Sequence, residues 1–261
     1  MRERNVLRKL VELMAVVCLM TMLLGMTSLA ADKVEGLALG QVVTNTDADN
    51  SITHYYKFKV KQSGALVVSA AAVNGNYTLG LDISLCNAKG KVLSTNFVNA
   101  GSPYESSRYV MYGLNKGTYK IKVKTPYAYS LQAAFKKYPE KSGKTQSKAV
   151  TLKKGRIKKG VVGIGESAKK ADWYKIVLKK PAKFSVTFDT ETSGTLYATL
   201  IPSKSTKVSG TYNMYSYNQP VSRSFKVTPG DRNLPAGTYY LKVYRASRDS
   251  KVSGVYALRW K

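Results

Sequence analysis

The sequence is poor in the residues from which most catalytic sites are built. It contains one histidine, His54, two cysteines and only 15 acidic residues among 261. Nucleophilic catalysis by serine or cysteine relies on a histidine to move the proton, zinc sites need clusters of His and Cys, and paired-acid hydrolysis needs carboxylates. A glycine-rich phosphate loop ahead of a helix is also absent. We therefore expect a protein that is not an enzyme.

Long apolar runs are confined to the first 31 residues. A positive start at Arg2 and Arg4 precedes an apolar run from Leu13 to about Met26, and small residues follow up to a cleavage point after Ala30. This order predicts a secretory signal peptide over residues 1–31. An uncleaved membrane anchor is the alternative, because the run is nearly as long as a spanning helix. Cleavage predicts a secreted or cell-surface bacterial protein with no stable transmembrane span.

Removal of the signal peptide leaves Cys86 as the one cysteine, which excludes an intramolecular disulfide. Leu81, Ile83 and Leu85 alternate just before it and predict the inward face of a strand. We expect Cys86 to be a small packing residue and not a nucleophile.

Negative charge is scarce and positive charge abundant. The chain has 42 basic residues and a formal net charge of +27, or +25 without the signal peptide. A net charge with a magnitude of about 2–8 is sufficient to keep a small domain soluble. The excess predicts attraction to polyanions such as nucleic acids, anionic membranes and acidic wall polymers. Export and the lack of a recognition helix argue against specific nucleic-acid binding.

What the chain does contain is an internal repeat. Residues 54–60 resemble 172–178, and residues 114–123 match 234–243, at offsets of 118 and 120 residues. Offsets of this size fit a duplicated domain better than a solenoid.

The predicted organisation follows from the repeat. The first copy is predicted over residues 32–138 and the second over 150–261. Residues 139–149 are polar, contain Pro and Gly, and predict a linker.

Each copy consists of short runs with a period of two residues. Tyr56, Phe58 and Val60, for example, alternate with lysines, and turn signals such as Asn115-Lys116-Gly117 separate the runs. This pattern is typical of strands with one face on a core and the other in water. The sequence therefore predicts an all-β protein with two tandem jelly-roll-like β-sandwich domains after an N-terminal signal helix.

These motifs resemble a known family. Residues 234–243 read Leu-Pro-Ala-Gly-Thr-Tyr-Tyr-Leu-Lys-Val, an aromatic strand stands earlier in each copy, and Leu81–Leu93 is similar to the middle of the domain. Together they resemble the bacterial pre-peptidase C-terminal domain. The resemblance implies a jelly-roll-like sandwich that assists secreted enzymes in targeting or substrate binding; some relatives bind collagen or polysaccharide, and some carry calcium. Here two tandem copies occur without an attached catalytic domain.

Polar side chains at two places could carry chemistry: His54, and the pair Asp47 and Asp49. His54 aligns with Asp172 of the second copy, which predicts a polar residue at a strand edge and not a catalytic base. Asp47 and Asp49 place oxygen ligands at alternate positions, as calcium requires, but Phe58 stands where a calcium loop would need glutamate. We expect a polar loop there. Calcium remains possible, and no other cofactor is predicted.

The candidate binding residues are lysines and tyrosines on outward strand positions. The lysines either form a solvated sheet face or bind a polyanion. The tyrosines either pack against neighbouring strands or stack on sugar rings. The candidates are Lys57, Lys59, Lys120 and Lys122, with Tyr212, Tyr215 and Tyr217.

Two functions remain open from the sequence. The first is a secreted, non-catalytic binding or adhesion module for anionic cell-wall polymers or polysaccharide. The second is an accessory subunit that targets a separately encoded secreted peptidase or glycosidase to its substrate.

Overall fold

The computed structural model describes residues 32–47, 52–73, 80–100, 109–139, 141–204, 212–216, 221–226, 233–246 and 251–261. The predicted signal peptide, and with it the signal helix, lies outside these ranges. The described residues form strands in four sheets and no helix, so they contain no helix that could cross a membrane. The all-β prediction is thereby confirmed for the described part of the chain.

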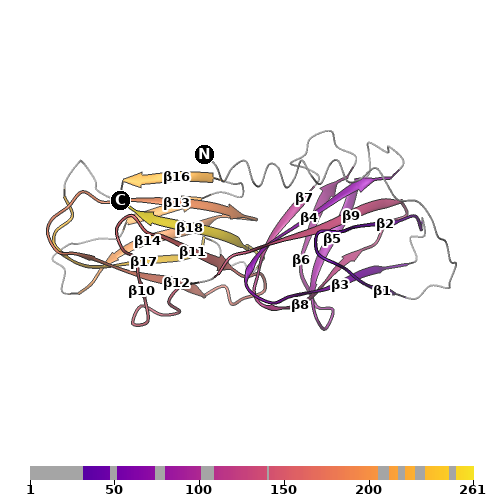
Figure 1. Ribbon diagram of the computed structural model, residues 1–261, viewed down its shortest axis with the longest axis horizontal. Helices are drawn as coiled ribbons and strands as arrows, with labels where there is room; N and C mark the ends of the chain where they lie inside the picture. Colours follow the sequence, from indigo (N-terminus) through magenta and orange to yellow (C-terminus); the bar gives the residue numbers. More distant parts are fainter. Residues whose placement is uncertain are drawn as a thin grey trace. The chain divides into compact units, whose positions relative to one another are not determined.

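The first half of the chain forms a five-stranded and a four-stranded sheet (Figure 1). The five-stranded sheet has the order β1 (Lys33–Gly36), β3 (His54–Val60), β8 (Gly117–Val123), β5 (Gly80–Asn87) and β6 (Val92–Asn99). The four-stranded sheet has the order β2 (Val42–Asn45), β9 (Tyr129–Lys137), β4 (Gly64–Ala72) and β7 (Tyr109–Leu114). The edge strand β1 pairs parallel to β3.

The second half repeats this order strand for strand. Its five-stranded sheet runs β10 (Val150–Thr151), β12 (Ala171–Leu178), β17 (Gly237–Arg245), β14 (Leu196–Pro202) and β15 (Tyr212–Ser216). Its four-stranded sheet runs β11 (Ile157–Val162), β18 (Gly254–Trp260), β13 (Ser185–Thr192) and β16 (Val221–Lys226). Edge strand β10 is parallel to β12, as β1 is to β3.

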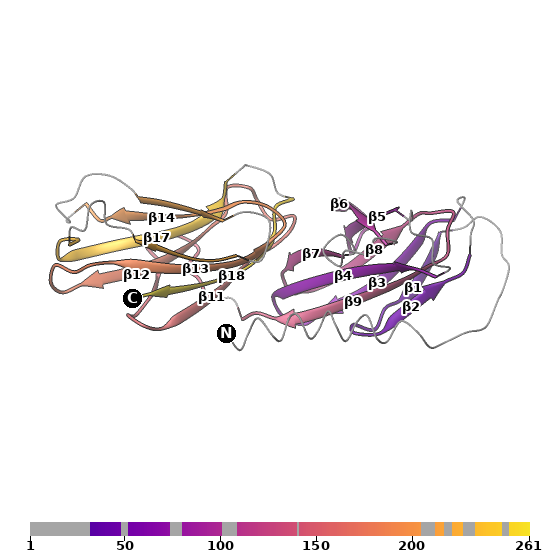
Figure 2. The ribbon, with the colours of Figure 1, turned by 90° about the horizontal axis from the view of Figure 1, so that it is seen from above.

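The two sheets of the second half share one hydrophobic core. Tyr174 and Leu241 of one sheet are buried in the same cluster as Phe188 and Leu258 of the other. Figure 2 shows the strands that form the two layers, β14–β17–β12 and β13–β18–β11. A shared core between two sheets is consistent with a β-sandwich.

The alternation predicted along β3 is confirmed. Tyr56, Phe58 and Val60 are buried, whereas Lys57 and Lys59 between them are exposed. In a strand, successive side chains point to opposite faces, so this pattern fixes which face of the sheet meets the core.

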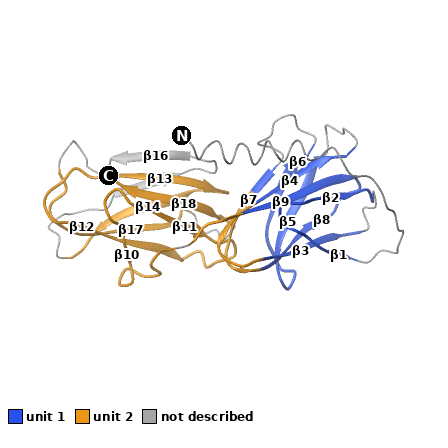
Figure 3. Cartoon of the chain, in the orientation of Figure 1, with its two compact units in different colours: residues 1–59, 67–110, 118–135 blue, residues 60–66, 111–117, 136–261 orange. Residues whose placement is uncertain are grey.

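The chain divides into two compact units (Figure 3). Unit 1 comprises Met1–Lys59, Val67–Val110 and Thr118–Phe135, and unit 2 comprises Val60–Leu66, Met111–Gly117 and Lys136–Lys261.

Two short segments of the first repeat therefore belong to unit 2. In one of them, the Gly113 amide donates to Ser253 Oγ at 3.2 Å, and the Gly113 carbonyl accepts from the Ile164 amide at 2.8 Å. A Cβ at Gly113 would lie 2.4 Å from the carbonyl oxygens of Val162 and Gly254, so this approach of backbones needs glycine.

The segment predicted as a linker is attached to β12. The Gly143 amide donates to the Trp173 carbonyl at 3.0 Å, and the Trp173 amide donates to the Gly143 carbonyl at 2.9 Å. Ser142 Oγ donates to Asp172 Oδ1 at 2.7 Å. Residues 141–149 are thus part of unit 2.

Candidate functional site

The four predicted lysines lie on one face of a sheet. Lys57 and Lys59 belong to β3, and Lys120 and Lys122 to β8, which is hydrogen-bonded to β3. Their neighbours along each strand point into the core, so all four lie on the outward side. We call this set of residues the lysine face.

No carboxylate of the described residues forms an ion pair with the lysine face. Lys120 Nζ lies 5.6 Å from the centre of the Tyr55 ring. Asp82, on the adjacent strand β5, is exposed on the same side of the sheet. Like charges held close together repel, and an external polyanion relieves that repulsion.

Cys86 lies beneath the lysine face. It is fully buried and pairs with Lys120 in the β5–β8 ladder, whereas Leu81, Ile83 and Leu85 point into the core as predicted. Burial raises the pKa of the Cys86 thiol, against the opposing effect of Lys122 and Lys120. The thiol therefore stays protonated and is a poor nucleophile.

The equivalent sheet of unit 2 has aromatic residues on its outer face. Trp173 on β12 pairs with Lys242 on β17, and in the next row Tyr244 on β17 pairs with Tyr197 on β14. All four side chains are partly exposed, and the residues between them point into the core. We call these four residues the aromatic face.

Contacts within the aromatic face fix its geometry. Lys242 Nζ lies 5.5 Å from the centre of the Trp173 ring and 4.6 Å from that of Tyr244. Tyr197 and Tyr244 meet edge to face, with centres 5.6 Å apart and planes at 69°. The buried Thr199 hydroxyl donates to the Tyr244 hydroxyl at 3.2 Å.

The aromatic face was not predicted from the sequence. Its signal was the alternation of Tyr240, Lys242 and Tyr244 along one strand, together with Trp173 in the place that Tyr55 holds in the first repeat. The central strand β17 pairs with β12 on one side and with β14 on the other, which brings together residues from segments distant in the sequence.

The predicted tyrosines follow at the edge of the same sheet. In β15, Tyr215 pairs with Tyr197 and Tyr212 with Leu200. Tyr217 lies outside the described residues. A role in binding for these three tyrosines remains a prediction.

His54 and Asp172 lie at the start of their strands, as the sequence indicated: His54 is the first residue of β3 and Asp172 the second of β12, and both are buried. Asp172 lies in a polar cluster in which Tyr256 Oη donates to its Oδ2 at 2.7 Å and Lys144 Nζ lies 3.9 Å from its Oδ1. His54 stacks on Tyr56 with ring centres 6.5 Å apart, and neither of its ring nitrogens has a hydrogen-bond partner among the described residues. Each repeat begins this strand with a polar group inside the fold.

The calcium prediction remains open. Asp47 lies 3.5 Å from Lys33 Nζ, and its amide donates to Asn45 Oδ1 at 2.9 Å. Asp49 lies outside the described residues. Within the described part of the chain, no group of three His, Cys, Asp or Glu residues could hold a metal ion.

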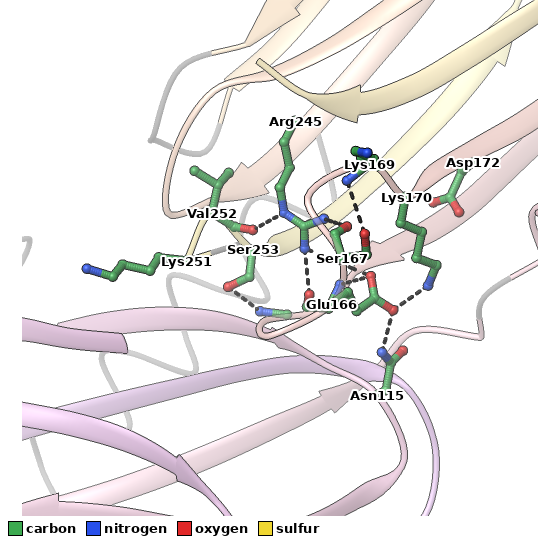
Figure 4. Close-up of polar contacts among 12 residues, drawn as sticks. Asn115, Glu166, Ser167, Lys169, Lys170, Asp172, Arg245, Lys251, Val252 and Ser253 are labelled. Atoms are coloured by element: carbon green, nitrogen blue, oxygen red, sulfur yellow. Dashed lines mark hydrogen bonds and ion pairs between the residues drawn. The ribbon is translucent and has the colours of Figure 1, made fainter. Parts of the chain in front are cut away.

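A buried arginine organises the loops at one end of unit 2 (Figure 4). Arg245, at the end of β17, donates from Nε to the Val252 carbonyl at 2.7 Å and from Nη2 to the Gly163 carbonyl at 2.6 Å. Its Nη1 donates to the Ser167 carbonyl at 3.3 Å. A guanidinium has five N–H donors, so three backbone carbonyls can be held by this one group.

Glu166 provides the countercharge for this arginine. Its Oε2 lies 3.9 Å from Arg245 Nη2 and accepts from the Gly163 amide at 3.1 Å. Its Oε1 accepts from Lys170 Nζ and, at 2.5 Å, from Asn115 Nδ2. Since the partners of both oxygens lie within unit 2, the cluster is a structural element that connects loops.

Comparisons with known proteins give only weak structural similarities. No protein-family model matches the chain. No curated protein matches its sequence either. The pre-peptidase C-terminal domain of collagenase from Bacillus anthracis is similar at 14% identity and TM-score 0.32, over 41% of this chain and 99% of that one. A fucolectin from Morone saxatilis serum shows 8% identity and TM-score 0.27 over 83% and 85% of the two chains. The CUB1-EGF-CUB2 domains of human MASP-1/3 show 8% identity and TM-score 0.22, over 85% of this chain and 99% of that one. Matches of this size identify no family for the chain.

Proposed function

We propose that the protein is an exported, non-catalytic binding module that attaches to an anionic polymer of the cell envelope through the lysine face. The observation that supports this function is the set of four outward lysines on β3 and β8, none of them in an ion pair within the described residues. The net charge of +25 without the signal peptide favours the same class of partner.

The expected strength of such contacts implies binding at many points. An exposed ion pair contributes about 0.2–1 kcal/mol, so four of them supply only a few kcal/mol. Attachment to a long polymer can add to this by avidity, since one chain engages several sites at once. We therefore expect binding to wall polymer to be much stronger than binding to its isolated repeating unit.

We also propose that the two halves are tandem copies of one jelly-roll-like domain of the pre-peptidase C-terminal type. The repeated order of nine strands supports a duplication, as do the recurring residues 54–60 and 172–178. In this proposal the protein acts without a cofactor.

The function is tested by sedimentation with purified cell walls across a salt series. The exported protein, residues 31–261, is compared with a variant in which all four residues of the lysine face are changed to Gln. A control variant carries the same charge change at exposed lysines elsewhere, namely Lys153, Lys154, Lys179 and Lys180.

We expect wild type and control to sediment at low salt and to be released at about 0.5 M NaCl, where the Debye length falls to about 4 Å. The lysine-face variant should bind about tenfold more weakly than the control, which is about 1.4 kcal/mol. Equal weakening of both variants would show that total charge and not the lysine face is responsible. Failure of the wild type to sediment at low salt would refute the function itself.

A further inference from the structure

The proposed binding through the lysine face does not involve the aromatic face. The aromatic face is nevertheless unusually rich in aromatic side chains for the outer face of a sheet. Such faces meet water and are normally polar. Here Trp173, Tyr197 and Tyr244 come from three adjacent strands and are partly exposed. With adjacent strands about 4.8 Å apart, the rings extend over about 10 Å across the sheet.

The aromatic face is also held in one arrangement before any ligand binds. Lys242 Nζ lies over two of the rings, and the Thr199 hydroxyl holds Tyr244, which in turn meets Tyr197 edge to face. Tyr and Trp side chains have few rotatable bonds, so little conformational entropy is lost when a ligand packs on them.

We propose that the aromatic face binds a segment of an acidic polysaccharide. The C–H face of a pyranose ring packs against the electron-rich face of an aromatic ring, which suits Trp173 and the tyrosines. Lys242 supplies a positive charge for a carboxylate on the sugar. This inference rests on the proposed function that the protein binds an envelope polymer, and it assigns a second, chemically different site to that polymer.

The charge of the face favours an acidic over a neutral sugar chain. Lys175 lies on the same side of β12, two residues from Trp173, so two ammonium groups flank the rings. Among the described residues neither Lys175 nor Lys242 forms an ion pair. A ligand with rings and carboxylates at regular spacing would satisfy both features.

The two repeats then differ in how they bind. In unit 1 the matching sheet carries Tyr55 beside Lys120, with exposed Lys57 and Lys59 on the same face. In unit 2 rings predominate. We therefore expect binding at the lysine face to be lost in salt and binding at the aromatic face to persist, because stacking is not screened by ions.

The test uses the intrinsic fluorescence of the exported protein, residues 31–261. Trp173 is partly exposed on the aromatic face, whereas Trp260, the other tryptophan, is 9% exposed. The protein is titrated at about 0.5 M NaCl, where charge contributes little, with a polyuronate, with its methyl-esterified form and with a neutral β-glucan. A Trp173→Phe variant identifies the signal that comes from Trp173.

We expect the polyuronate to change the fluorescence of Trp173 and to bind about tenfold more weakly to a Tyr197→Ala, Tyr244→Ala double variant. Tyr127→Ala, which removes an exposed tyrosine in unit 1, is the matched control and should leave binding unchanged. The melting temperature of each variant establishes that a loss of affinity is not a loss of folding. At low salt the affinity for the polyuronate should exceed that for its methyl ester, because Lys242 and Lys175 then attract the carboxylates.

The possible outcomes separate this inference from the proposed function. Salt-sensitive binding to walls without any response of Trp173 to the polyuronate would refute the inference and leave the proposed function standing. Equal affinity for the polyuronate and the neutral glucan at low salt would refute the acidic specificity. Salt-resistant binding that survives in the lysine-face variant and is lost in the tyrosine double variant would support the inference.

Discussion

One buried position is occupied by different residues in the two repeats. Asp172 accepts a hydrogen bond from Tyr256, which pairs with Tyr174 at 2.8 Å between hydroxyl oxygens. In the first repeat Tyr56 and Tyr129 form the same pair at 2.8 Å, and His54 takes the place of the aspartate. A buried polar group without a partner costs about 1–3 kcal/mol. Among the described residues the His54 ring nitrogens have no partner, so we expect His54 to stabilise its repeat less than Asp172 does.

Because His54 is buried, we expect the protein to lose stability in mild acid. Burial lowers the pKa of His54 from 6.5, and nearby Lys33 lowers it further, while Asp47 and Glu35 act in the opposite direction. Because the folded pKa lies below the unfolded one, protons bind the unfolded chain more tightly. The free energy of unfolding should be constant above about pH 6.5 and fall as the pH drops from there to the lowered folded pKa.

Urea unfolding between pH 7.5 and 5 measures this effect, in a range above the usual pKa of carboxylates, about 4. The His54→Gln variant cannot gain a proton and should lose much less stability over that range. An identical pH dependence of the two proteins would show that His54 does not titrate on unfolding.

The sequence predicted which lysines point outward, but it did not predict which polar residues are buried. A period of two is visible in the sequence, so Lys57 and Lys59 could be placed opposite the core in advance. Nothing local distinguishes a polar residue at a strand edge from one covered by other segments. The covering of Asp172 by Ser142 and Tyr256 arises from contacts 30 and 84 residues apart in the chain.

At the scale of elements, the pairing of β13 with β18 depends on one glycine. Gly254 has φ +153°, and a Cβ there would lie 2.2 Å from the Glu191 carbonyl oxygen and 2.6 Å from Thr192 Cα. Both contacts are with backbone, which cannot rotate away as a side chain can.

Gly254→Ala should therefore lower the free energy of unfolding by about 1–3 kcal/mol, through backbone strain and partial separation of the two strands. The midpoint of urea unfolding measures this loss. Gly36→Ala is the control, because nothing lies within 4 Å of a Cβ at that residue. Equal midpoints for the two variants would contradict the predicted role of Gly254.

Turns could be predicted better than strand order. Ala88-Lys89-Gly90 has the same kind of turn sequence as Asn115-Lys116-Gly117, and it does form a turn: Gly90 has φ +88°, its amide donates to the Asn87 carbonyl at 3.0 Å, and Asn87 Oδ1 accepts from the Lys89 amide. The parallel edge strands were not predicted. β10 has two residues, too few to show a period, and its partner β12 lies some twenty residues further along the chain.

At the scale of the whole molecule, the sequence predicted a duplication but could not predict the compact units. Val60–Leu66 and Met111–Gly117 lie inside the first repeat and yet belong to unit 2. Gly113 contacts Ser253 across 140 residues of sequence, and no periodicity in a single chain encodes such a contact.

Two compact units predict two unfolding events that respond to different changes. Asp172→Ala leaves the Tyr256 and Ser142 hydroxyls without their acceptor and should destabilise unit 2 by about 1–3 kcal/mol. Acidification should act on unit 1, where His54 lies. Differential scanning calorimetry should therefore show one transition lowered by Asp172→Ala and the other lowered by a change from pH 7.5 to 5.5.

The control for this experiment is Asp82→Ala, which removes an exposed carboxylate and should change stability by less than about 0.5 kcal/mol. A single transition that moves equally in response to both changes would show that the units unfold together.

The hydrogen-bonded segment before β10 also bears on resistance to proteolysis. Residues 141–149 contain Lys141, Lys144 and Lys148, and a polar stretch of this kind is where a trypsin-like protease would be expected to cut. Cleavage requires the backbone to leave its place and enter the protease as an extended strand. With both backbone groups of Gly143 bonded to Trp173, entry first requires these bonds to break. We therefore expect the protein to resist cleavage in this segment between its two halves.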